Sequence, residues 1–162
     1  MERANPSRAI GAGFLATLVM TILAYLAPNM GMPPMDFAAM LGTFLTGRAA
    51  PPGSGVWWLG MIVHFIDGTI IFPLIYAYLL YPVLPGRPWL KGVLWGLILW
   101  ALSGALAMPV MGLGFFAAGA ARRGLVILGS LLAHIVYGAI LGSIAGPQAT
   151  RVAQVREERR AA

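Results

Sequence analysis

Two histidines stand at matching places in two apolar stretches of the 162-residue chain, and the chain has no others. A residue able to form hydrogen bonds follows each histidine after three positions, and a glycine follows after four. Residues at these spacings share one face of a helix. Ionisable groups at membrane depth are costly and are functional-site candidates by default. The predicted site therefore comprises six residues: His64, Asp67, Gly68, His134, Tyr137 and Gly138.

The two imidazoles predict a haem b site. Histidines at the same depth on facing helices can supply both axial ligands of the iron. The glycine that follows each histidine either makes room for the porphyrin or lets two helices approach closely. Such a group carries one electron at a time without a catalytic acid. We therefore expect a non-catalytic protein that acts in electron transfer or cofactor handling.

A metal ion is the alternative cofactor. His64, Asp67 and His134 form a two-histidine, one-carboxylate set suited to iron or zinc. Thioether ligands select Cu(I), and Met61 lies three residues before His64. Seven methionines fall at the ends of the spans predicted to face the periplasm: Met30, Met32, Met35, Met40, Met61, Met108 and Met111. Copper or iron at His64, His134, Asp67 and Met61 is thus a second hypothesis.

A structural role competes with both cofactor hypotheses. Polar side chains often join helices in membranes without any further task. In this interpretation Asp67 forms a hydrogen bond with Tyr137 or a histidine, and both histidines are packed core. The protein would then be a structural or assembly subunit of a larger membrane complex.

Composition defines the environment of these residues. Hydrophobic residues make up 59% of the chain and charged residues 10%, against about 25% charged in soluble domains. The absence of cysteine excludes disulfides, cysteine-based zinc sites and iron–sulfur clusters. The net charge of +6 arises at chain ends and connections, which indicates membrane orientation rather than nucleic-acid binding.

Four apolar stretches are long enough to cross a bilayer, which takes about 20 helical residues. Only helices satisfy the backbone in lipid when a chain this short crosses it several times. The sequence therefore predicts an all-α, four-transmembrane-helix bundle over residues 1–147 and a polar cytoplasmic tail over residues 148–162. The predicted spans are 10–27, 56–81, 90–113 and 124–145.

The basic residues predict the orientation. Eight of the eleven Lys and Arg residues lie in the N-terminus, the second connection and the tail. The positive-inside rule therefore places both termini in the cytoplasm and the bundle in a bacterial inner membrane. The expected partners are the lipid bilayer and either other membrane-protein subunits or a second copy.

The chain also resembles one two-helix hairpin written twice. Segment 27–32 recurs as 108–113, and both following helices contain His-x-x-x-Gly. Tandem hairpins would be parallel repeats about an axis along the membrane normal. Between the first two spans, the apolar segment 34–45 predicts a short helix on the periplasmic surface, with Asp36 capping its first turn.

Several motifs together resemble a bacterial domain-of-unknown-function family of small four-helix membrane proteins. The resemblance covers the chain up to about Gly146 and implies the fold and a membrane location, but no activity or cofactor. The motifs are Met30-Gly31-Met32-Pro33-Pro34-Met35-Asp36, Met40-Leu41-Gly42, Trp58-Leu59-Gly60, His64-Phe65, Gly68-Thr69 and His134-x-x-Tyr137-Gly138.

Overall fold

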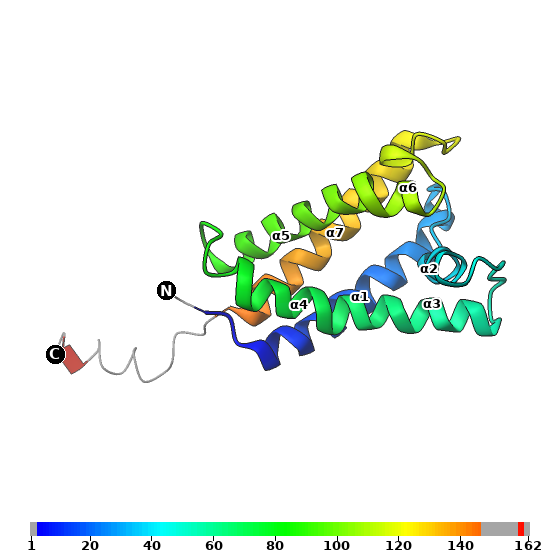
Figure 1. The fold of residues 1–162 in the computed structure, drawn as a ribbon. Coiled ribbons are helices and arrows are strands. Elements are labelled where there is room, and N and C mark those ends of the chain that lie inside the picture. Colours follow the sequence, from blue (N-terminus) through cyan, green and yellow to red (C-terminus); the bar gives the residue numbers. More distant parts are fainter. Residues whose placement is uncertain (1–2, 147–158, 161–162) are drawn as a thin grey trace.

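Four long apolar helices form a bundle in the computed structural model, which describes residues 3–146 and 159–160 (Figure 1). All regular structure within these residues is helical, so the prediction of an all-α membrane bundle is confirmed. The predicted tail lies outside the described residues apart from 159–160. The candidate membrane spans are Pro6–Met30, Gly55–Leu80, Pro88–Val110 and Arg123–Ala145.

Each span is built from one to four consecutive segments. The first comprises α1 (Pro6–Leu26) and the 3₁₀ turn η1 (Ala27–Met30). The short helix α2 (Phe37–Thr46) precedes the second span. That span comprises α3 (Gly55–Ile66), η2 (Asp67–Ile71), α4 (Phe72–Ile75) and η3 (Tyr76–Leu80). The third comprises α5 (Pro88–Leu102), η4 (Ser103–Ala107) and α6 (Met108–Val110), and η5 (Phe115–Ala117) leads to α7 (Arg123–Ala145).

The described beginning and end of the bundle lie together (Figure 1). The Asn5 side chain accepts from the Arg8 N–H at 3.0 Å and starts α1. The Asn5 N–H donates to the Ala145 carbonyl at 3.0 Å, and Arg8 donates to the Gly146 carbonyl at 3.0 Å. Four crossings thus return the chain to one end of the bundle. The assignment of that end to the cytoplasm stays a prediction.

Prolines impose three π-helical segments on the spans. The segments η2, η3 and η4 each end two residues before a proline, at Pro73, Pro82 and Pro109. A proline ring clashes with the carbonyl four residues earlier in an α-helix and lacks an N–H. A wider turn before the proline relieves this clash, and the helix then includes Pro73 and Pro109, whereas the second span ends before Pro82. Such π segments are frequent at functional sites, and two of these three begin at residues that line the cavity described below.

Glycines bring the helices of each hairpin together. A Cβ at Gly138 would collide with the Gly92 carbonyl, and one at Gly68 would collide with the Thr17 hydroxyl. The glycine four residues after each histidine therefore lies at a helix contact in both halves. The halves differ in their connections, because α2 has 10 residues whereas η5 has three. The duplication itself stays a prediction.

The Asp36 carboxylate holds α2 on the bundle through hydrogen bonds. Asp36 caps α2 by accepting from the Ala39 N–H at 2.9 Å. It also accepts from the Trp57 indole of α3 at 2.9 Å and from the Tyr25 hydroxyl of α1 at 2.9 Å. The short helix expected from the sequence is thus present, and one side chain joins it to two spans. It lies across the end of the bundle opposite the chain ends (Figure 1).

Candidate functional site

A cavity of about 490 Å³ lies inside the bundle near α2. Its walls are mainly apolar, and every span contributes to them. This volume is within the usual range of about 300–1,000 Å³ for small-molecule sites. The polar side chains in the wall are few: Thr17, His64, Asp67, Ser103, His134 and Tyr137.

His64 is held by α3 and by a hydroxyl from α1. Its Nε2 lies 2.9 Å from the Thr21 hydroxyl oxygen. That hydroxyl donates its proton to the Thr17 carbonyl at 2.7 Å, so in this arrangement it accepts from His64. Neutral His64 therefore carries its proton on Nε2 and keeps a lone pair on Nδ1. Phe37 of α2 stacks on the ring, with centroids 5.2 Å apart.

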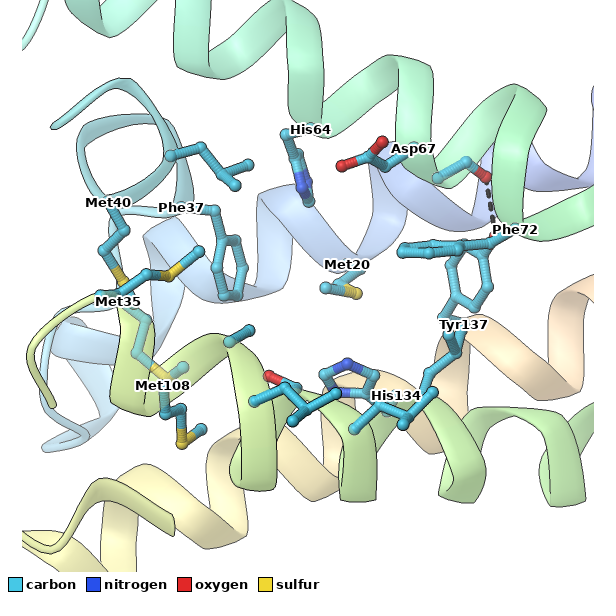
Figure 2. A pocket seen from close by; sticks show the side chains of 18 of the residues that line it. Met20, Met35, Phe37, Met40, His64, Asp67, Phe72, Met108, His134 and Tyr137 are labelled. Atoms are coloured by element: carbon cyan, nitrogen blue, oxygen red, sulfur yellow. Dashed lines mark hydrogen bonds between the residues drawn. The ribbon is translucent and has the colours of Figure 1, made fainter. Parts of the chain in front are cut away.

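His134 faces His64 from α7, on the opposite wall of the cavity (Figure 2). Its Nδ1 lies 2.7 Å from the Ser130 carbonyl one turn earlier. A carbonyl oxygen only accepts, so Nδ1 carries the proton and Nε2 of the neutral ring has the lone pair. A histidine whose Nδ1–H is fixed by a backbone carbonyl is oriented to act through Nε2.

The first π segment, η2, carries Asp67 and is hydrogen-bonded to Tyr137 of α7. Asp67 is the first residue of η2 and points into the cavity (Figure 2). The Tyr137 hydroxyl donates to the Gly68 carbonyl at 2.7 Å. The Phe72 N–H donates to the Asp67 backbone carbonyl, and residue 73 is a proline without an N–H. The helix therefore offers the Gly68 carbonyl no donor. Tyr137 supplies the missing donor from another span.

Two residues predicted from the sequence do not line the cavity. Gly138 and Met61 are not among its lining residues, and Gly138 contacts α5 instead. Within the described residues, no three or more His, Asp or Glu side chains form a group that could hold a metal ion. The cavity therefore brings together five of the six predicted residues without assembling the expected metal-ligand set.

Two polar residues of the site were missed from the sequence. Ser103 begins η4 just as Asp67 begins η2, and each precedes a proline by six residues. That common spacing was the available signal. Thr17 is fully buried, and its hydroxyl has no hydrogen-bond partner within the described residues. Its signal was the four-residue spacing of small residues at Gly13, Thr17 and Thr21, which is typical of a helix contact.

Comparison with known proteins identifies one family. No protein of curated function and no solved structure matches the chain. A family of unknown function, DUF6789, matches residues 4–155. The match includes all four spans, the short helix α2 and every residue that lines the cavity. The chain therefore belongs to DUF6789, a family of unknown function.

Proposed function

We propose that the protein holds a redox cofactor, haem b or a metal ion, between His64 and His134 inside the bundle, for electron transfer or cofactor handling. One observation carries this proposal. Two imidazoles line opposite walls of one mainly apolar cavity of about 490 Å³ (Figure 2). Packed core would leave no such space between them, since protein interiors have few voids larger than a water molecule. The cavity thus favours binding over the structural alternative.

Haem b is the cofactor that two opposed imidazoles predict most directly. His134 needs no change, because Nδ1–H bonds to Ser130 and leaves Nε2 for the iron. His64 would ligate through Nε2 only after its hydrogen bond to Thr21 breaks. The group would then carry single electrons at a depth shielded from water.

Copper or iron is the other cofactor in this hypothesis. Because the described residues contain no metal-binding group of His, Asp and Glu, a metal ion would also need thioether ligands. Copper(I) accepts such ligands. The methionines that line the cavity are Met20, Met35, Met40, Met108 and Met111.

An absorption spectrum of the protein purified in detergent tests the haem hypothesis. A Soret band that disappears in His64→Ala and His134→Ala is expected, and Leu128→Ala on the exposed face of α7 is the matched control. Copper or iron would instead appear at stoichiometric amounts in elemental analysis and be lost in the same variants. If the folded protein contains neither and binds no other redox cofactor, the structural or assembly role is the better description.

A further inference from the structure

The cavity is open toward the lipid on one side. Four of its lining residues are large, apolar and exposed on the outer surface of the bundle: Phe44 at 50%, Leu102 at 46%, Leu106 at 61% and Val110 at 58%. They come from α2 on one side and from α5, η4 and α6 on the other. Leu102, Leu106 and Val110 belong to the third candidate span and face hydrocarbon in a membrane, whereas Phe44 lies on α2 at the end of the bundle. A ligand can therefore reach the cavity sideways from the bilayer, with an apolar tail left among the lipids.

Polar groups lie at the opposite, inner part of the same cavity. The polar side chains in that part of the wall include His64, Ser103 and His134. One ring nitrogen of His64 and one of His134 forms a hydrogen bond within the protein. The other nitrogen of each neutral ring, Nδ1 of His64 and Nε2 of His134, is a free acceptor. Polar groups in an apolar wall are stabilised by hydrogen bonds to what they face, so the inner wall suits a ligand with a polar head. The polarity runs from an apolar opening to a polar interior.

The charge of the wall restricts that head group. No Lys or Arg is among the residues that line the cavity. Buried charges need a partner, so a phosphate head group would be unpaired here. The two propionates of haem b would be unpaired as well, unless they lay outside the cavity. Asp67 is the one acidic residue in the wall, so an anionic head group does not fit, whereas a polar and uncharged one does.

We propose, building on the function inferred above, that the cofactor is a quinol lipid that inserts head first through the opening between Phe44 and Leu106. A quinol has a small uncharged ring with two hydroxyl groups and an isoprenoid tail. Nε2 of neutral His134 is an acceptor, and it therefore pairs with a hydroxyl but not with a quinone carbonyl. The site consequently binds the reduced form more tightly than the oxidised form.

Calorimetric titration of the full-length protein in nanodiscs tests this inference, with decylubiquinol and decylubiquinone as probes. The quinol is expected to bind about tenfold more tightly than the quinone, since one well-made hydrogen bond is worth roughly that factor. His134→Ala should remove this preference. Ser103→Ala should weaken binding of both forms, since the Ser103 hydroxyl lines the cavity and can donate to either oxygen.

The lateral opening has its own test. Leu106→Trp should weaken binding of both probes at least tenfold by filling the opening. Leu128→Trp, at a comparably exposed site on α7, should leave binding unchanged, and circular dichroism checks that both variants fold. Equal binding of quinol and quinone, or no effect of Leu106→Trp in the folded protein, would overturn the inference.

The result also separates this inference from the proposed function. Stoichiometric haem that depends on both histidines would overturn the quinol assignment and leave a redox cofactor in the cavity. Failure of the folded protein to bind haem, metal or quinol would overturn both.

Discussion

Replacing Tyr137 by phenylalanine should destabilise the bundle by about 1–2 kcal/mol. The change removes only the hydroxyl that donates to the Gly68 carbonyl at 2.7 Å. The side chain is 3% exposed, so water does not replace the lost donor. An unsatisfied buried acceptor costs about 1–3 kcal/mol, whereas side-chain hydrogen bonds in membranes average about 0.6 and reach about 1.7 kcal/mol. The upper part of the membrane range applies because Pro73 removes the backbone alternative.

Unfolding in mixed micelles of increasing dodecyl sulfate content, followed by circular dichroism, measures this free energy. Tyr78→Phe is the control, because Tyr78 lies in the same span and is 60% exposed. Its loss of a hydroxyl should cost less than 0.5 kcal/mol, which is the usual limit for surface changes.

A double-mutant cycle with Pro73→Ala tests the cause. Alanine restores an N–H at residue 73, which reaches the Gly68 carbonyl in the i→i−5 pattern of a π segment. Tyr137→Phe should then cost little, with a coupling free energy of about 1 kcal/mol between the two sites. An equal cost of Tyr137→Phe with proline or alanine at position 73 would refute the reasoning.

Two further predictions concern the helix contacts. Asp36→Ala should destabilise α2 by about 1–2 kcal/mol, because α2 loses its cap and its hydrogen bonds to Trp57 and Tyr25. Hydrogen exchange of the α2 backbone amides should become faster, and unchanged exchange would contradict the proposal that Asp36 holds α2 on the bundle. Gly138→Ala should destabilise the α5–α7 contact because a methyl group collides with the Gly92 carbonyl, whereas Gly124→Ala, with open space at its Cβ, should be neutral or stabilising in the same micelle unfolding experiment.

The candidate site was only partly predictable. Histidine spacing identified His64 and His134, and both line the cavity. The same spacing also selected Gly138, which packs against α5. A glycine row in an apolar helix is compatible with a ligand slot and with a helix contact, so spacing alone could not separate the two uses.

The polar wall was less predictable still. Thr17 and Ser103 are common residue types in membrane helices, and neither is ionisable. Their placement depends on how α1 and η4 are rotated about their axes. The prolines contained part of this information, because Pro73 and Pro109 each follow the start of a π segment by six residues.

The sequence by itself determined the membrane environment, the four crossings and the return of the chain to its starting side. Lipid imposes these features, because each crossing must satisfy its own backbone with about 20 apolar residues in a helix. The tertiary structure alone decided which face of each helix turns inward. In lipid the outer face is as apolar as the core, and α1 is accordingly apolar around its whole circumference. The periodicity that marks the interior of a soluble protein is therefore absent, and only the packing of the spans brings the two imidazoles and Ser103 to one cavity.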